Sequence, residues 1–246
     1  MLEIASLVKN YGAVQAIRGI DISVKEGEIF TFLGPSGCGK TTTLQSIAGL
    51  ETPTSGQITM AGEPVFDSSR NILVPANRRR LGMVFQSYAI WPHMSVFENV
   101  AFPLVHGSSS YSKNEIRELA RNALKLVKMD EYIDRPAPHL SGGQQQRIAL
   151  ARAIVHKPRL LLLDEPLSNL DAKLRDTMRV ELRQLIKDLG ITTTFVTHDQ
   201  TEALSMSDRS VLMKDGEIVQ VGTPREVYLR PETSFTADFM GRSNLV

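Results

Sequence analysis

The sequence is short of several features that mark special classes of protein. It has a single cysteine among 246 residues, which excludes an internal disulfide and fits a reducing compartment. No apolar run approaches the ~18 residues that a membrane helix needs. The first residues lack the basic and apolar segments of a secretory signal peptide. We therefore expect a soluble chain that serves a membrane, if it does so, only through partners.

The chain also lacks an excess of charge of either sign. The formal net charge is +1, so nothing marks a general nucleic-acid binder, and we expect no nucleic-acid partner. The densest basic run is Arg78–Arg80, which we interpret as a solvated loop rather than a phosphate-binding patch. What remains is ordinary globular composition, with 42% hydrophobic and 22% charged residues. The length suits one large domain, or one domain with a subdomain.

The first part of the chain alternates apolar and polar positions. The segments "LEIASLV", "IRGIDISV" and "EIFTFLG" predict strands, with Gly27 in the turn of a hairpin. A helix then ends near Gly49, and "GQITMAG" predicts another short strand. These patterns predict an antiparallel β layer mixed with the start of an α/β core.

The pattern changes from about Ser87 to His139, where apolar residues take helical spacing. We predict a helical insertion there, with Ser112 or Asn114 capping its second helix. After it, fully apolar strands such as "RLLLLDE" alternate with amphipathic helices. This alternation predicts a parallel sheet that is covered on both faces, followed by a hairpin with Asp215–Gly216 at its turn.

One glycine-rich stretch matches a phosphate-binding pattern in full. Residues Gly34–Thr41, "GPSGCGKT", fit G-x-x-x-x-G-K-[ST], with a predicted strand before them and a predicted helix after them. The glycines let successive N–H groups point at one anion, and the helix N-terminus adds positive potential. We predict that Lys40 reaches the β- and γ-phosphates of a nucleotide and that Thr41 ligates Mg²⁺.

The single cysteine, Cys38, lies inside this loop. It could be no more than a small buried residue, but placement at a helix N-terminus tends to lower the pKa of a thiol. We therefore expect alkylation of Cys38 to block ATP hydrolysis, and bound nucleotide to protect it.

Two adjacent carboxylates follow the apolar run Leu160–Leu163. A solvated strand end would explain Asp164 and Glu165 in isolation, since unpaired carboxylates are costly to bury. In a chain with a phosphate loop, however, Mg²⁺ needs an acidic partner and the attacking water needs to be positioned. We predict the metal role for Asp164 and the water-activating role for Glu165.

Two more polar residues follow predicted strands. His198 leaves the C-terminal end of "ITTTFVTHD", the edge at which α/β proteins bind ligands, and it could contact a γ-phosphate. Gln86 ends "LGMVFQ", and its neutral amide suits orienting a water or completing Mg²⁺ coordination. On placement alone, a structural role is an equally good interpretation of each residue.

A second glycine-rich stretch, "LSGGQQQR", begins at Leu140. Ser141 and Gln144 fit a capping box that opens a helix. Gly142 and Gly143 are poor helix formers, but they leave N–H groups bare at the positive end of the helix dipole. The stretch is therefore either a well-capped helix start or half of another phosphate site.

Six motifs in one order resemble the nucleotide-binding subunit of an ATP-binding cassette (ABC) transporter. They are "GPSGCGKT", "VFQ", "LSGGQ", "LLLLDEP", "SNLD" and "THD". The resemblance covers essentially the whole chain, and "LSGGQ" is its most family-specific element. It implies a P-loop NTPase (RecA-like) α/β core with a parallel sheet, an N-terminal antiparallel β subdomain and a helical signalling subdomain at about residues 87–155. It implies one nucleotide-binding domain over residues 1–246, with ATP and Mg²⁺ bound.

The resemblance assigns one set of residues to nucleotide and metal binding. Tyr11 is similar to the aromatic residue that stacks on adenine. The Walker A loop of the family corresponds to Gly34, Pro35, Ser36, Gly37, Cys38, Gly39, Lys40 and Thr41, with Thr42 just beyond. The γ-phosphate of an ATP held by a second copy would be bound by Ser141, Gly143 and Gln144.

The resemblance assigns a second set to hydrolysis. Asp164 resembles the Walker B aspartate, which binds the metal, and Glu165 resembles the general base. Gln86 resembles the residue that senses both metal and permease. Asp171 is similar to the aspartate of the D-loop, and His198 to the switch histidine. The family pattern is met at every catalytic position.

The implied function is transport driven by a homodimer. ATP would close the dimer, with two ATP molecules between each Walker A loop and the other copy's "LSGGQ", and hydrolysis would reopen it. The dimer would drive transmembrane permease subunits from the cytoplasmic face of the cell membrane, and a periplasmic or extracellular substrate-binding protein would deliver the solute. "SYAIWPHMSVFENV" is the candidate permease-docking surface, although Tyr88, Ile90, Trp91 and Phe97 could belong to the core.

The subfamily is suggested by longer stretches. "THDQTEALSMSDR" and "GEIVQVGTPREVYLRPET" resemble bacterial importers of maltodextrins, polyamines, sulfate or ferric iron, and we expect ferric iron or a polyamine. Those subunits commonly continue into a regulatory β-barrel, and this sequence ends about where the barrel would begin. We therefore expect the barrel to be absent from it.

Two other classes stay open. A soluble ABC ATPase for DNA repair or translation would need a coiled-coil insertion or a second cassette. A P-loop kinase or other nucleotide enzyme would need a second substrate pocket, and it would not need "LSGGQ".

Overall fold

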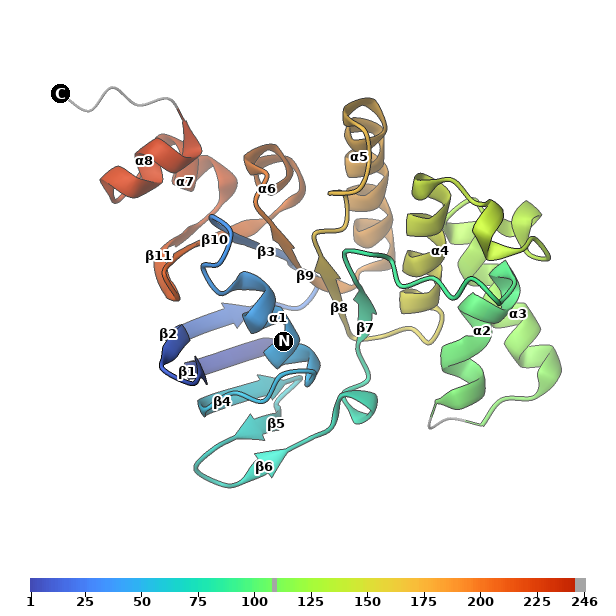
Figure 1. Cartoon of the computed structure of the whole chain (residues 1–246), viewed down its shortest axis with the longest axis horizontal. Helices are drawn as coiled ribbons and strands as arrows, with labels where there is room; N and C mark the ends of the chain where they lie inside the picture. Colours follow the sequence, from blue (N-terminus) through green and yellow to red (C-terminus); the bar gives the residue numbers. More distant parts are fainter. Residues whose placement is uncertain (108–109, 242–246) are drawn as a thin grey trace. The chain divides into compact units, whose positions relative to one another are not determined.

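The computed structural model describes residues 1–107 and 110–241 (Figure 1). The chain divides into two compact units, of which unit 1 is Met1–Arg79 with Thr192–Val246 and unit 2 is Arg80–Ile191. The phosphate loop lies in unit 1, whereas "LSGGQ" and the acidic pair lie in unit 2. No helix within the described ranges is both long and apolar enough to cross a membrane.

Unit 1 contains an antiparallel sheet in the order β2-β1-β4-β5-β6. Its strands are β1 (Leu2–Tyr11), β2 (Val14–Val24), β4 (Ser55–Met60), β5 (Glu63–Asp67) and β6 (Ile72–Leu73). Alternate residues of β1 such as Leu2 and Ile4 are buried, as the sequence pattern requires of a sheet with one covered face. The predicted N-terminal antiparallel subdomain is confirmed.

Unit 1 also contains parallel strands. β3 (Ile29–Leu33) pairs in parallel with β9 (Thr192–Thr197) on one side and with β10 (Arg209–Lys214) on the other. Every residue of β3 and β9 is buried, which is typical of parallel strands. β11 (Glu217–Gly222) returns antiparallel to β10 through Asp215 and Gly216, both with positive φ, so the predicted hairpin is confirmed.

The prediction of a hairpin at Gly27 is wrong. β2 belongs to the antiparallel sheet and β3 to the parallel one, so the chain crosses between sheets at this turn. The Gly27 N–H instead donates to Thr192 Oγ1 at 3.0 Å, at the start of β9. The sequence misleads here because an apolar run shows that β3 is buried but does not show which strands it joins.

The described helices of unit 1 contact this core. They are α1 (Lys40–Ala48), α6 (Gln200–Met206), α7 (Pro224–Leu229) and α8 (Ser234–Met240), with a 3₁₀ turn at Ala76–Arg78. Leu33 and Leu212 of the parallel strands form one apolar cluster with Ala203, Val227 and Met240 of the last three helices. α1 ends at Gly49, which takes the left-handed conformation with φ of 79°, as the sequence predicts.

The interpretation of Arg78–Arg80 as a solvated loop is wrong at its middle residue. Arg79 is buried, and its guanidinium donates to the carbonyl oxygens of Ser46 and Ile47, each at 2.8 Å, at the end of α1. Burial lowers the pKa of Arg79 to about 10, so it stays charged at neutral pH. A cation there satisfies last-turn carbonyls and complements the helix dipole. The run thus stabilises the helix that follows the phosphate loop.

Over its described residues, 80–107 and 110–191, unit 2 combines two short strands with four helices. β7 (Gly82–Val84) pairs in parallel with β8 (Leu160–Asp164). The helices are α2 (Val96–His106), α3 (Lys113–Leu126), α4 (Gly142–Ile154) and α5 (Ala172–Leu189), with 3₁₀ turns at Asp130–Tyr132 and Ala137–His139. α2, α3 and α4 contact one another, as expected of the helical insertion. The boundaries of a signalling subdomain at residues 87–155 stay a prediction.

Capping boxes start three of these helices. Ser95 with Glu98 opens α2, Ser112 with Glu115 opens α3, and Ser141 with Gln144 opens α4. Of the two predicted caps of α3, the residue that serves is Ser112.

Candidate functional site

The phosphate loop connects the C-terminal end of β3 to the start of α1. Gly34 has φ of 151°, and a Cβ atom there would lie 2.3 Å from Met213 O. Gly39 has φ of 101°, and its Cβ would lie 2.5 Å from Ala16 O. Both contacts are with backbone atoms, so neither position can accommodate a side chain without moving a strand. The fold itself therefore requires glycine at these positions.

Lys40 is the first residue of α1, and its side chain turns back into the loop. Its Nζ donates to the carbonyl oxygens of Gly34 and Pro35, each at 2.8 Å, and the residue is only 5% exposed. The positive charge is thus held inside the curl of the loop, where the N-terminal N–H groups of α1 also point. Ser36 and Gly37 form the exposed tip, and Thr41 and Thr42 are half-buried in the first turn.

Cys38 differs from the expectation for a helix N-terminus. The residue is 2% exposed, and burial raises the pKa of its thiol, although Lys40 acts in the opposite direction. The expected lowering is therefore wrong, because removing the thiolate from water outweighs the nearby positive charge. At neutral pH, Cys38 is a protonated, buried thiol that packs under the loop; its Sγ would lie 2.8 Å from a Cβ at Gly34.

Tyr11 ends β1 beside this loop. It pairs with Val14 across the β1–β2 turn, and two residues further on, the carbonyl of Ala16 lies against Gly39. The residue is 45% exposed, so its side chain is available to a ligand. Lys9 Nζ lies 4.6 Å from the centroid of the ring.

His198 follows β9 directly and is exposed. Leu33, which precedes the phosphate loop, pairs with Thr197, which precedes His198, so loop and histidine leave the same edge of the parallel strands. The neighbours of His198 are fixed: Thr197 Oγ1 accepts from the Asp199 N–H at 3.0 Å, and the Asp199 carboxylate caps α6. The structure therefore brings His198 and the phosphate loop to one edge, as predicted.

In unit 2, the acidic pair ends β8, as predicted. Asp164 is buried, and Glu165 takes a left-handed conformation with φ of 44°. Such a conformation is uncommon outside glycine and is found where the surroundings enforce it. Here the Glu165 carbonyl accepts hydrogen bonds from the Ser168 hydroxyl at 3.0 Å and the Ser168 N–H at 3.2 Å. The local turn thereby holds the backbone of Glu165 in its left-handed conformation.

Gln86 and Glu165 come together in unit 2. Gln86 Nε2 donates to Glu165 Oε2 at 3.1 Å, and the register of β7 and β8 pairs Val84 with Leu163 just before them. Asn169 completes the arrangement, because its Nδ2 donates to Gln86 O at 2.6 Å. Sequence reasoning gave Asn169 no role of its own, although it lies in the quoted motif "SNLD".

The segment after Gln86 is fixed by a residue that sequence reasoning missed. Tyr88 and Ala89 both have positive φ, and the Arg152 guanidinium donates to each of their carbonyl oxygens at 2.7 Å. It also lies 4.6 Å from the ring centroid of Trp91. Arg152 is 7% exposed, and burial lowers its pKa to about 10. Within the candidate docking segment, Tyr88 is thus core, and Arg152 in the last turn of α4 holds the stretch from Tyr88 to Trp91.

The second glycine-rich stretch is a helix start, as its capping box predicts. Ser141 Oγ accepts from the Gln144 N–H at 3.4 Å, and Gln144 Oε1 accepts from the Ser141 N–H at 2.9 Å. Gly142 is exposed and Gly143 is buried, where a Cβ would lie 3.0 Å from Leu174 Cδ2. Asp171, the predicted D-loop aspartate, caps α5 through the Leu174 N–H at 3.0 Å. Four predicted site residues, Ser141, Gly143, Gln144 and Asp171, therefore belong to two neighbouring helix starts.

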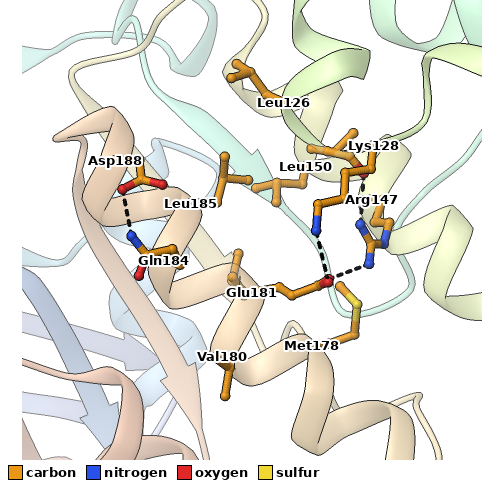
Figure 2. Close-up of a pocket in the computed structure, with 12 residues that line it drawn as sticks. Leu126, Lys128, Arg147, Leu150, Met178, Val180, Glu181, Gln184, Leu185 and Asp188 are labelled. Atoms are coloured by element: carbon orange, nitrogen blue, oxygen red, sulfur yellow. Dashed lines mark hydrogen bonds and ion pairs between the residues drawn. The ribbon is translucent and has the colours of Figure 1, made fainter.

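An ion cluster holds α4 one turn further on. Figure 2 shows Arg147 and Lys128 both directed at the Glu181 carboxylate of α5, with Lys128 Nζ 3.4 Å from Oε1. Arg147 also donates to the Val127 carbonyl at 2.9 Å. The cluster borders a cavity of about 320 Å³ whose floor includes Leu150 and other apolar side chains. The segment that follows α3 is thus joined to α4 and α5 close to "LSGGQ".

These features define a P-loop ATPase cassette. A buried strand, a glycine-rich loop and a helix that begins with lysine make the phosphate-binding element of unit 1. Unit 2 supplies a strand that ends in carboxylates and a capped helix that begins with "GGQ". The family model described as ABC transporter matches residues 17–168, more than half of the chain. The chain belongs to the ABC transporter family of ATP-binding cassettes, and the P-loop kinase alternative is set aside.

Named relatives narrow the comparison to import systems. The Fe(3+) ions import ATP-binding protein FbpC of Rhizobium etli is 54% identical over 97% of this chain and 65% of its own length. The spermidine/putrescine import ATP-binding protein PotA of Photobacterium profundum is 51% identical over 100% and 64%. The trehalose/maltose import ATP-binding protein MalK of Thermococcus litoralis is 51% identical over 95% and 62%. The chain therefore spans less than two thirds of each of these relatives.

Solved structures confirm the fold class. The ATP-binding cassette MJ0796, described as a dimer in a post-hydrolysis state bound to ADP and Pi, is 32% identical, with a TM-score of 0.78 over 92% of this chain and 99% of that one. The protein cbiO1 of Clostridium perfringens, described as part of an ABC transporter complex, is 33% identical, with a TM-score of 0.82 over 94% and 91%.

Proposed function

We propose that this chain is the ATP-hydrolysing subunit of an importer, and that closure and reopening of a homodimer powers a separate membrane permease. The observation that carries the proposal is the exposed, capped start of α4 in a chain that already has a complete phosphate loop. A helix start of this kind is an anion site. Two such elements on one chain suit a pair of ATP molecules bound between two copies.

ATP binding falls to the residues around the phosphate loop. Lys40 and the N–H groups at the start of α1 bind the β- and γ-phosphates, and Tyr11 stacks on adenine. The proposed donors for Mg²⁺ are the hydroxyl of Thr41, the amide of Gln86 and the carboxylate of Asp164, each of which offers the oxygen that this ion prefers. When bound, Mg²⁺ would neutralise charge on the phosphates.

Hydrolysis falls to Glu165 as general base. In this structure, its Oε2 accepts a hydrogen bond from Gln86, which orients the carboxylate. A water that is to lose its proton to Glu165 has to donate a hydrogen bond to one of the two carboxylate oxygens. His198 contacts the γ-phosphate from the edge at which the phosphate loop begins.

The second copy completes the site. Ser141, Gly143 and Gln144 bind the γ-phosphate of the ATP held by the partner, and Asp171 lies at the adjoining helix start. The description of MJ0796 as a dimer bound to ADP and Pi supports this arrangement.

The cellular setting is proposed from the names of the relatives. Import ATP-binding proteins for ferric ions and for spermidine and putrescine support a ferric-ion or polyamine importer. The chain would act at the cytoplasmic face of the cell membrane on permease subunits, with a substrate-binding protein delivering the solute. Co-purification with two membrane proteins from the native host would separate this proposal from a soluble ABC ATPase.

The test of the mechanism is Glu165→Gln. We expect ATP hydrolysis to fall about 100-fold or more, because the general base is lost, while ATP now holds the dimer together. Phosphate release and size-exclusion chromatography with ATP measure the two effects. Glu131→Gln, which changes an exposed carboxylate of the same unit, is the control and should hydrolyse and elute like the wild type. A Glu165→Gln chain that stays monomeric at saturating ATP, or hydrolyses normally, contradicts the assignment.

A further inference from the structure

The ring of Tyr11 is backed by a cation that no part of the proposed function uses. Lys9 Nζ lies 4.6 Å from the ring centroid, within the range of a cation–π interaction. The two residues belong to the same strand, β1, and the ring is the exposed aromatic at its end.

The ammonium of Lys9 is held firmly. Its Nζ donates to Thr52 O at 2.8 Å and forms an ion pair with Glu51 Oε2 at 2.8 Å, and its side chain is only 12% exposed. Hydrogen bonds from Lys9, with a smaller contribution from Tyr11, hold the pKa of Glu51 below its usual value, so the anchor stays ionised at neutral pH. An ammonium has three N–H donors. Two oxygens, Thr52 O and Glu51 Oε2, lie within hydrogen-bonding distance of the Lys9 ammonium. The Tyr11 ring also lies close to its positive charge.

The location connects this cluster to the phosphate loop. Tyr11 pairs with Val14, and the nearby Ala16 carbonyl lies so close to Gly39 that a Cβ there would be 2.5 Å away. The β1–β2 turn therefore lies beside the start of α1. With a cation on one face and 45% of the residue exposed, the ring offers its other face to a ligand bound there.

We propose that Lys9 is a positioning residue for the base of ATP, which fixes and polarises the Tyr11 ring without contacting the phosphates. The inference rests on the proposed binding of ATP. A cation draws π-electron density toward its own side, which makes the open face a better partner for an electron-rich adenine. A ring that is already fixed also loses less conformational freedom when the base stacks on it.

The test separates the base from the phosphates. Binding of Mg·ATP and of inorganic tripolyphosphate is measured by titration calorimetry on the whole chain and on Lys9→Met. We expect Lys9→Met to weaken ATP binding about three- to tenfold, and to leave tripolyphosphate binding within about twofold. Lys9→Arg, which keeps a cation over the ring, should restore ATP binding. Lys25→Met, an exposed lysine of the same unit, is the charge control and should change neither ligand.

Two further variants test the route of the effect. In a Tyr11→Ala background, Lys9→Met should not weaken ATP binding any further, because the ring through which Lys9 acts is gone. Glu51→Gln, which removes the ion pair but leaves the Thr52 carbonyl to hold Lys9, should weaken ATP binding by a smaller factor.

Three results would overturn the inference while leaving ATP binding established: equal losses for ATP and tripolyphosphate, no loss for ATP, or full additivity with Tyr11→Ala. Failure of the wild-type chain to bind ATP at all would instead overturn the proposed function, and this inference with it.

Discussion

The two glycine-rich stretches of the chain need glycine for different physical reasons. In the phosphate loop, Gly34 and Gly39 have φ of 151° and 101°, and a Cβ at either would meet a backbone oxygen within 2.5 Å. At the start of α4, Gly142 and Gly143 lie in the first turn of a regular helix, and an added Cβ would meet only leucine side chains. The fold requires the first pair, whereas in the second pair Gly142 has room for a Cβ and at Gly143 a leucine side chain would have to give way.

This difference between the two pairs of glycines indicates which pair is present for a ligand rather than for the fold. Glycines that the fold requires would be present in any loop with this geometry, whatever it binds. Glycines that the fold does not require are poor helix formers, so they cost stability. They leave the start of α4 without side chains, as an approaching phosphate or partner surface would need. Four experiments test this comparison.

The largest effect is expected in the phosphate loop for Gly39→Ala. The new Cβ would lie 2.5 Å from Ala16 O at a left-handed φ, so we expect a loss of about 3 kcal/mol of unfolding free energy and of ATP binding. Urea unfolding and ATP titration measure both. Gly37→Ala is the matched control, because φ is 81° but nothing lies within 4 Å; it should lose only about 1 kcal/mol. Equal losses for the two variants would contradict the steric argument.

The next effect concerns the second stretch, where Ser141→Ala should separate hydrolysis from binding. Loss of the γ-phosphate contact to the partner's ATP should lower hydrolysis about 100-fold. ATP binding by the single chain, which depends on Lys40, should stay within about twofold. Because Ser141 also caps α4, the free energy of unfolding should fall by about 1 kcal/mol.

Ser112→Ala is the control for this variant, since it removes an equivalent cap from α3. It should match the stability loss of Ser141→Ala and keep hydrolysis. If both serine variants hydrolyse equally well, the start of α4 is a capped helix and nothing more.

The sequence predicted a structural feature when the residues that determine it are close together in the chain. The phosphate loop, the capping box of Ser141 and the placement of Glu165 at a strand end were all predicted, because each depends on neighbours within a few residues. The Gly27 hairpin was wrong because apolar patterning does not encode which strands pair. Arg79 was misjudged because its acceptors, such as Ser46 O, lie 33 positions away in the sequence. Arg152 was missed for the same reason, and so was the anchoring of Lys9, whose acceptor Thr52 O lies 43 positions away.

A smaller effect is expected for the thiol inside the phosphate loop. Burial raises the pKa of Cys38, so less thiolate is present at neutral pH than in a free thiol. Alkylation by iodoacetamide should therefore be slower than that of free cysteine at pH 7.5, and its rate should rise as the pH rises. Mass spectrometry against time measures it. Unfolding in urea should remove the difference, bound ATP should slow the reaction further, and the modified chain should not hydrolyse ATP.

The alkylation experiment tests the phosphate loop, the first of the two glycine-rich stretches compared above. If the native chain reacts as fast as free cysteine at pH 7.5, Cys38 is not held under the loop. Full hydrolysis after complete modification would likewise show that the interior of the loop tolerates added volume.

The smallest effect distinguishes the two glycines of α4 from each other. Gly142→Ala adds a Cβ 3.9 Å from Leu170 Cδ2, an ordinary contact, so unfolding free energy should rise by up to about 1 kcal/mol through better helix propensity. Gly143→Ala places its Cβ 3.0 Å from Leu174 Cδ2, which has to give way, so the gain should be smaller or absent. Urea unfolding of both variants, with hydrolysis measured alongside, compares them directly. If Gly142→Ala stabilises the chain and yet lowers hydrolysis, that glycine is present for a ligand or partner and not for the fold. A stabilised variant with full hydrolysis would show that no ligand or partner needs the bare backbone at Gly142.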